Sequence, residues 1–137
     1  MNPALPFARM VVGFAVFLNC AFAVEDDRPK VARFEDMRYP LVARVQHVEG
    51  VVVVKVEVDE KGAVVTATAL SGPRELVPES ILNAKKWRFI ERNAGNLLIV
   101  YEFRIAGLCN QPCPSHFVVR PPNFAVITIG EPVLDHY

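Results

Sequence analysis

The sequence predicts an α+β fold in which one helix packs on one face of a small antiparallel sheet. Two neighbouring stretches, residues 51–58 and 63–70, have the pattern of a β-hairpin. A stretch with helical spacing begins near Pro78, and residues 97–105 alternate again with a period of two. The expected order is therefore β-β-α-β. A right-handed crossover from the second strand to the third places the strand 51–58 in the middle.

The first strand has one consistently apolar face. Every even position from 52 to 58 is valine, whereas Lys55 and Glu57 make the odd positions polar at the far end. Side chains of a strand point alternately to its two faces, so the even valines predict the side that packs against a core. Residues 59–62 follow as a tight turn in which Gly62 can adopt a positive φ.

The return strand, residues 63–70, is rich in β-branched and small residues. Its register stays open at this stage. Val64 cannot share a face with Ala67 and Ala69 unless a bulge lies between them.

The helix is expected to have an apolar side and a charged side. It begins near Pro78, because proline is favoured in the first turn, where its missing N–H is not needed. The residues expected toward the sheet are Val77, Ile81, Ala84 and Trp87 or Arg88, and those expected toward solvent are Glu79, Asn83, Lys85 and Lys86.

The third strand alternates over residues 97–105. One face carries Leu97, Ile99, Tyr101, Phe103 and Ile105, and the face away from the helix carries Leu98, Val100, Glu102 and Arg104. Two further apolar runs, residues 117–120 and 124–129, are separated by Pro121-Pro122-Asn123 and predict one or two extra C-terminal strands.

Several short motifs occur in a fixed order along this core. They are Tyr39-Pro40 with Ala43, Val48-Glu49-Gly50-Val51-Val52, the Asp59 to Gly62 turn, Ser71-Gly72 and Trp87-Arg88-Phe89. In order and spacing they resemble the C-terminal domain of the TonB energy transducers over residues 39–105, about half of the chain. The resemblance implies a TonB C-terminal-like fold and a protein-binding function rather than an enzymatic one.

The resemblance also implies where a partner binds. In that family the domain captures a short extended segment of an outer-membrane transporter, which adds as a strand beside the last strand of the sheet. By position, that strand is residues 97–105, so the expected partner-binding residues are Leu98, Ile99, Val100, Tyr101, Glu102 and Arg104. An exposed strand edge suits this role because its N–H and C=O groups are unpaired. The alternative is that residues 117–120 or 124–129 pair with this strand and seal its edge.

Composition and motifs argue against other function classes. Fifteen basic residues balance fifteen acidic ones in 137 residues, and no basic stripe suggests nucleic-acid binding. The histidines, His47, His116 and His136, lie far apart, and no nucleophile elbow or phosphate-binding glycine loop occurs. We therefore expect no catalytic residues, no cofactor, no metal site and no small-molecule substrate.

The N-terminal residues predict export to the periplasm. In residues 1–23, Arg9 precedes an apolar run, and Ala21-Phe22-Ala23 has the small-x-small pattern of a signal-peptide cleavage site. A retained membrane anchor and lipidation at Cys20 are the alternatives. Residues 24–38 are charged and predict a solvated lead-in or linker before the domain at residues 39–137, which comprises a core at 39–105 and a tail at 106–137.

The tail contains two cysteines close together, Cys109 and Cys113. In an oxidising compartment this spacing favours a disulfide within the loop. The alternatives are a metal site that also includes His116, a redox pair, and free thiols.

Two functional hypotheses follow from these observations. The first is a periplasmic module that binds an extended peptide by strand addition and is related to TonB-dependent energy transduction. The second is a self-contained structural protein, or one that dimerises through the same edge, whose sheet is sealed by the tail.

Overall fold

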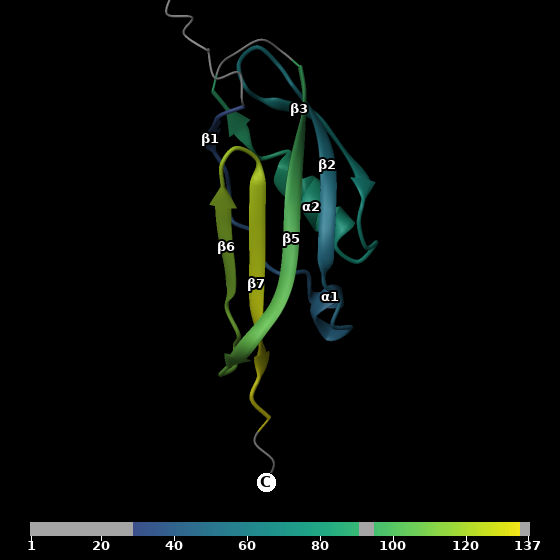
Figure 1. The fold of residues 1–137 in the computed structure, drawn as a ribbon, viewed down its shortest axis with the longest axis vertical. Coiled ribbons are helices and arrows are strands. Elements are labelled where there is room, and N and C mark those ends of the chain that lie inside the picture. Colours follow the sequence, from purple (N-terminus) through teal and green to yellow (C-terminus); the bar gives the residue numbers. More distant parts are fainter. Residues whose placement is uncertain (1–28, 91–94, 135–137) are drawn as a thin grey trace, which may run out of the picture.

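The computed structural model describes residues 29–90 and 95–134. Its main feature is a five-stranded sheet with the strand order β3-β2-β5-β7-β6 (Figure 1). The elements in chain order are β1 (Val31–Arg33), α1 (Leu41–Val45), β2 (Gly50–Val58), β3 (Val64–Ser71), α2 (Val77–Ala84), β4 (Arg88–Phe89), β5 (Gly95–Cys109), β6 (Ser115–Arg120) and β7 (Phe124–Pro132). The α+β class predicted from the sequence is confirmed.

The sheet is mixed, not purely antiparallel as expected. β2 pairs antiparallel with β3 and β5, and β6 pairs antiparallel with β7, but β7 runs parallel to β5. Parallel neighbours need a connection of about a dozen residues. Residues 110–123, which include β6 at the outer margin, provide it and let β7 return between β5 and β6.

A bulge in the return strand resolves the register that the sequence leaves open. The register of β3 against β2 shifts between the pairs Glu57–Thr66 and Val58–Val64, and again between the pairs Val53–Ser71 and Val54–Ala69. The first shift lets β3 turn Val64 and Ala67 toward the same side, where both pack against the core.

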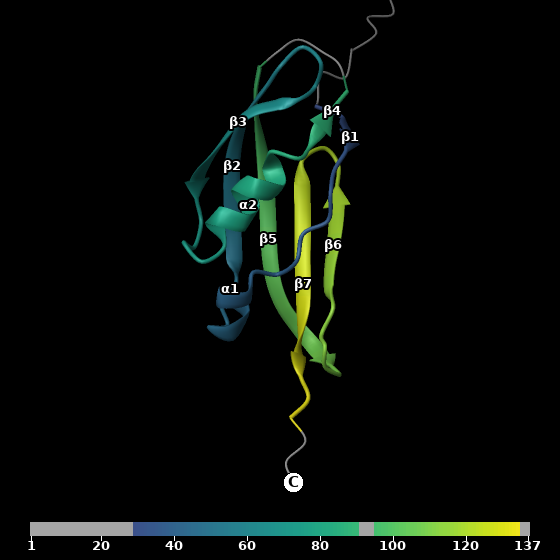
Figure 2. The ribbon, with the colours of Figure 1, turned by 180° about the vertical axis from the view of Figure 1, so that it is seen from behind.

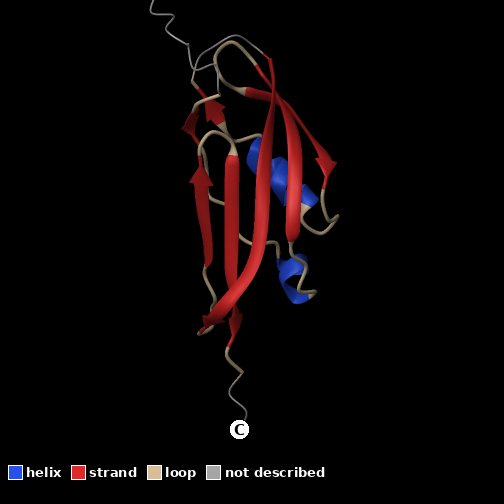
Figure 3. Ribbon diagram, in the orientation of Figure 1, coloured by secondary structure: helices blue, strands red, loops and turns tan. Residues whose placement is uncertain are grey.

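Both helices lie on the same side of the sheet. Figure 2 shows α2 across one face, and Figure 3 shows that the opposite face has no helix over it. The buried side chains beneath α2 come from the predicted inner faces. They are Val52, Val54 and Val56 of β2, Ile99, Tyr101 and Phe103 of β5, and Ala84 and Trp87 at and just after the end of α2.

One helix residue was assigned to the wrong side. Asn83, expected in solvent, is only 4% exposed. Its Oδ1 accepts hydrogen bonds from Trp87 Nε1 (2.8 Å) and the Tyr101 hydroxyl (3.0 Å), and its Nδ2 donates to the Glu35 carbonyl (2.8 Å). A buried amide is tolerated when its hydrogen-bonding groups are satisfied. Asn83 thus ties α2 to β5 and to the chain before α1.

The described part of the lead-in is mostly exposed, but it also packs against the domain. β1 pairs with β4, Met37 is buried, and the Phe34 ring lies 6.1 Å from that of Trp87 and 5.8 Å from that of Phe117. The prediction was based on the charged residues of this segment. Its apolar residues make these contacts, while its charged side chains stay in solvent. The predicted signal peptide, residues 1–23, lies outside the described residues. No helix in the described ranges combines the length and hydropathy needed to cross a membrane.

The turn at Gly62 yields a stability prediction. Gly62 has φ +82°, and a Cβ there would lie 1.9 Å from the Phe89 carbonyl oxygen. We expect Gly62→Ala to lower the free energy of unfolding by about 1–3 kcal/mol, because it combines backbone strain with a clash. The matched control is Gly95→Ala, where a Cβ meets nothing within 4 Å. Urea unfolding measures both, and equal effects of the two substitutions would contradict this account.

The Asn83 network yields a second stability prediction. Asn83→Ala removes the acceptor of two buried donors and should cost about 2–4 kcal/mol of unfolding free energy. Tyr101→Phe removes one of these donors, keeps the ring, and should cost about 1 kcal/mol. Denaturant unfolding, followed by the fluorescence of Trp87, the single tryptophan, measures the unfolding free energies of the two variants. A cost for Asn83→Ala no larger than that for Tyr101→Phe would show that the network is not important for stability.

Candidate partner-binding site

The strand predicted to bind a partner is an interior strand. β5 pairs with β2 along one side, where Val100 lies opposite Val53, and with β7 along the other, where Val100 lies opposite Phe124. Both sides of residues 100–103 therefore carry neighbouring strands, and the expectation of an open edge along these residues is wrong. Pairing by residues 124–129, the alternative considered from the sequence, is what the structure shows.

The predicted site residues divide between two faces of β5. Ile99 and Tyr101 are buried in the core, whereas Leu98 on the outer face is 45% exposed. Val100 and Glu102 are half-buried on that outer face, and Arg104 is exposed beside them. Arg104 Nη2 lies 2.5 Å from Glu102 Oε1, an exposed ion pair of the kind that contributes little to stability. These residues share one strand but do not form a pocket.

The C-terminal hairpin is joined to β5 by side chains as well as by strand pairing. The Val100 N–H donates to the Asn123 carbonyl (2.9 Å), and Asn123 Nδ2 donates to the Leu98 carbonyl. Ala125, Ile127 and Ile129 of β7 are buried in the common core. β7 is thus an integral strand of the sheet.

With β5 enclosed, the margins of the five-stranded sheet are β3 and β6 (Figure 1). The two margins differ in regularity. β3 has two register shifts against β2, and such irregularities are a common protection of edge strands. β6 pairs with β7 over six consecutive residues without a shift, and its outward side chains His116, Val118 and Arg120 are exposed. β6 is therefore the more regular free edge.

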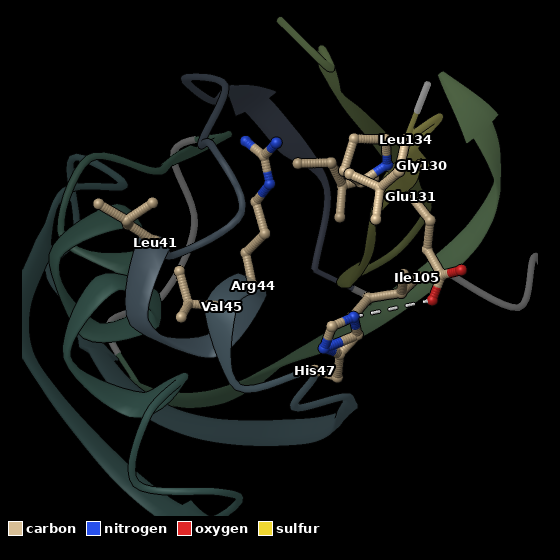
Figure 4. A pocket seen from close by; sticks show the side chains of 10 residues that line it. Leu41, Arg44, Val45, His47, Ile105, Gly130, Glu131 and Leu134 are labelled. Atoms are coloured by element: carbon tan, nitrogen blue, oxygen red, sulfur yellow. Dashed lines mark ion pairs between the residues drawn. The ribbon is translucent and has the colours of Figure 1, made fainter. Parts of the chain in front are cut away.

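A cleft of about 480 Å³ lies where α1 approaches the far ends of β5 and β7. Figure 4 shows lining residues of the cleft, with Arg44 of α1 between Leu41 and Val45 on one side and Glu131 and Leu134 of the C-terminal segment on the other. The full lining is Leu41, Arg44, Val45, His47, Ile105, Ile129, Gly130, Glu131, Pro132 and Leu134. Sequence reasoning missed this site, because its residues come from segments about 60 to 90 positions apart.

The polar groups of the cleft lie on its rim. His47 Nε2 lies 3.9 Å from Glu131 Oε1, so protonation of the imidazole would form an ion pair there. His47 also has a positive φ of 53°, which turns the chain from α1 toward β2.

The two cysteines of the tail form a disulfide, as predicted. Cys109 and Cys113 are bonded, with 5.5 Å between their Cα atoms. This pairing rules out both the metal site with His116 and the free thiols for this state. Gly130 lies against the bridge, since a Cβ there would be 2.9 Å from Cys109 Sγ.

The most perturbed ionisable groups in the described chain have structural roles. Burial, with a smaller contribution from the charge of Glu49, raises the pKa of Tyr39 to about 12. Burial also raises the pKa of Tyr101 well above its usual range. Both hydroxyls donate hydrogen bonds, Tyr39 to the Val48 carbonyl (2.6 Å) and Tyr101 to Asn83. Among the described residues, no three His, Cys, Asp or Glu side chains lie close enough together to hold a metal ion.

Comparison with known proteins finds a family match. The model of the family described as "Gram-negative bacterial TonB protein C-terminal" matches residues 35–104, just over half of the chain. The matched region runs from the segment before α1 to Arg104 in β5, and leaves out β6 and β7. A search of curated proteins finds no match.

Proposed function

The chain belongs to the family of Gram-negative bacterial TonB protein C-terminal domains, and we propose that it is a non-enzymatic periplasmic module that binds an extended segment of another protein by β-strand addition. Domains of this family interact with proteins such as outer-membrane transporters and take part in energy transduction. A protein partner is therefore the class of ligand that the family supports. The predicted signal peptide supports the periplasmic location.

The observation that carries the mechanism is the regular free edge of β6. By resemblance to the family, the incoming strand is expected beside β5. In this chain β7 occupies that position. The hairpin of β6 and β7 therefore moves the outer margin of the sheet by two strands. Because β6 is paired without a register shift, its outward N–H and C=O groups form a continuous row to which an extended peptide can bind.

The segments around β6 support this assignment. The inward side chains of β6 are fixed, since Phe117 packs against Phe34 and the Ser115 hydroxyl accepts a hydrogen bond from the Tyr39 N–H (2.9 Å). A rigid edge loses little conformational entropy when a strand is added. The partner in this proposal is a segment of an outer-membrane transporter, and the role is related to TonB-dependent transport.

A second candidate follows from the same edge. Two copies could pair through β6, which would make the chain a dimer or a structural protein that offers no edge to a peptide. The sealing of β5 by β7 favours this alternative, because it removes the binding position typical of the family. The two candidates differ in stoichiometry, so they can be distinguished in solution.

The test is the mapping of amide chemical shifts during titration with a panel of extended heptapeptides from outer-membrane transporters. We expect shifts concentrated in Ser115–Arg120, because only these backbone groups would gain hydrogen-bond partners. Val118→Lys should weaken binding up to about fivefold, since a lysine on an edge strand opposes pairing. Thr66→Lys, an exposed change on the β3 margin, is the matched control and should leave affinity unchanged.

Other outcomes would each contradict a stated part of the proposal. Shifts in Val64–Ser71 would move the site to β3, and shifts in residues 97–105 with loss of the β7 signals would indicate displacement of the hairpin. Concentration-dependent shifts in β6 without peptide, with a dimer in light scattering, would favour self-association. No shift with any peptide would contradict strand addition altogether.

A further inference from the structure

Exposed aliphatic side chains gather toward one end of the molecule. α1 and the ends of β5 and β7 lie toward this end in Figures 1 and 2. Six large aliphatic side chains are 47–77% exposed there: Leu41, Val42, Val45, Leu108, Val133 and Leu134. Single exposed apolar residues need no explanation, but a group of this size in one region is typical of an interaction site.

The cleft described above separates two groups of these side chains. Leu41 and Val45 line it from α1, and Leu134 lines it from the C-terminal segment. Ile105 and Ile129, which are paired neighbours in β5 and β7, belong to the same lining. Ile129 is already buried, so the surface that a ligand would newly cover belongs mainly to the exposed leucines and valine. The site is thus a hollow between aliphatic projections.

The lining of the cleft fits a hydrocarbon chain better than a peptide. An extended peptide would need an open strand edge, and residues 106–108, which extend beyond β2, do not line the cleft. Protein-binding sites are enriched in aromatic side chains, whereas the apolar lining here consists of leucine, valine, isoleucine and proline. Burial of a hydrocarbon chain requires only apolar area, because the hydrophobic effect is non-directional. The acyl chain of a lipid meets this requirement.

The cleft carries a cationic and an anionic side chain. Arg44 comes from α1, and Glu131 comes from the C-terminal segment on the other side (Figure 4). The Glu131 carboxylate is directed toward His47, with 3.9 Å between Oε1 and Nε2. No ion pair between described residues joins Arg44 to Glu131. A ligand with one anionic and one cationic group would therefore satisfy both side chains.

A phosphoethanolamine headgroup has these two groups. Its phosphate can accept two parallel hydrogen bonds from a guanidinium such as that of Arg44. Its primary ammonium can donate charge-assisted hydrogen bonds to a carboxylate such as that of Glu131. Together with the aliphatic lining, this charge pattern is complementary to a zwitterionic phospholipid.

We propose that this end of the molecule binds the surface of a membrane that contains phosphatidylethanolamine. The phosphate would meet Arg44, the ammonium would meet Glu131, and the upper part of an acyl chain would lie in the cleft against Leu41 and Leu134. The other exposed aliphatic side chains would enter the apolar layer beside it, as at the apolar face of an interfacial helix. The cleft volume of about 480 Å³ is within the range of about 300–1,000 Å³ that ligand sites have. This inference goes beyond the proposed function and does not depend on strand addition at β6.

The headgroup is tested by flotation of the protein, purified after export, with vesicles of phosphatidylcholine alone or mixed with an equal part of phosphatidylethanolamine. We expect about fivefold tighter binding to the mixed vesicles, because a primary ammonium can donate hydrogen bonds to Glu131 and a trimethylammonium cannot. Glu131→Gln should remove this preference. Glu79→Gln, the same change at an exposed position of α2, is the matched control and should retain it.

The apolar contacts and the phosphate contact are tested with the same vesicles. Leu41→Ser and Leu134→Ser should each weaken binding about tenfold, because a leucine side chain would no longer leave water. Leu82→Ser, which changes a 54% exposed leucine of α2, should have no effect. Arg44→Gln should weaken binding to both kinds of vesicle about fivefold, since both lipids carry a phosphate. Arg74→Gln is its control, at a side chain that is 94% exposed.

Amide chemical shifts locate the site independently of affinity. Dihexanoyl phosphatidylethanolamine, a short-chain lipid that is monomeric in dilute solution, should shift residues 41–47 and 129–134 and leave β6 unchanged. Unchanged β2 amide shifts in each variant would show that the substitutions leave the fold intact. Lipid-induced shifts that are absent from the cleft would overturn the proposal.

Other results would also overturn it. These are no binding to either kind of vesicle, a preference for phosphatidylethanolamine that survives Glu131→Gln, and an equal loss of binding in Leu82→Ser and Leu134→Ser. Tighter binding to phosphatidylglycerol vesicles than to the phosphatidylethanolamine mixture would indicate an anionic surface instead. A dimer in light scattering that Leu134→Ser dissociates would make a second copy the occupant. Peptide binding at β6 is measured without lipid, so either proposal can fail while the other stands.

Discussion

The parallel pairing of β5 with β7 is the constraint on which the account depends. It encloses the strand that would otherwise form the margin of the sheet, and it brings Ala125, Ile127 and Ile129 into the common core. It also carries β7 past the end of β2, so that Ile129 and Glu131 face α1 across the cleft. The free edge at β6 and the cleft beside α1 are both consequences of this one pairing.

Local patterns predicted the local structure well, because they depend on neighbouring residues. The even valines from 52 to 58 are buried, and the alternation in residues 97–105 places Ile99, Tyr101 and Phe103 inside. The division of the helix residues between the sheet side and the solvent side was predicted less well. Asn83 is buried because its partners Tyr101 and Glu35 are remote in sequence, and no helical pattern contains that information.

Whether the edge of the candidate strand is open depends on long-range pairing, and the sequence therefore left that question undecided, whereas in the structure β7 pairs with β5. One signal for the position of β7 was available in the sequence. Residues 124–129 are apolar except for Thr128 and show little alternation, and such runs are typical of strands in the interior of a sheet. The alternating pattern of β6, with His116 and Arg120 outward, is typical of a margin. The cleft offered no such signal, since α1 and residues 129–134 are neighbours only through the fold.

The central claim is that β7 is a stable neighbour of β5. The stability of the β6–β7 hairpin against local opening tests this claim most directly. Native-state hydrogen exchange of the free protein measures it residue by residue. The account predicts that amides of Ala125–Ile129 open only with global unfolding and exchange as slowly as those of β2 and β5. Exchange of these β7 amides through a low-energy local opening, while β2 stays protected, would contradict it, because β5 would then be an intermittently free edge.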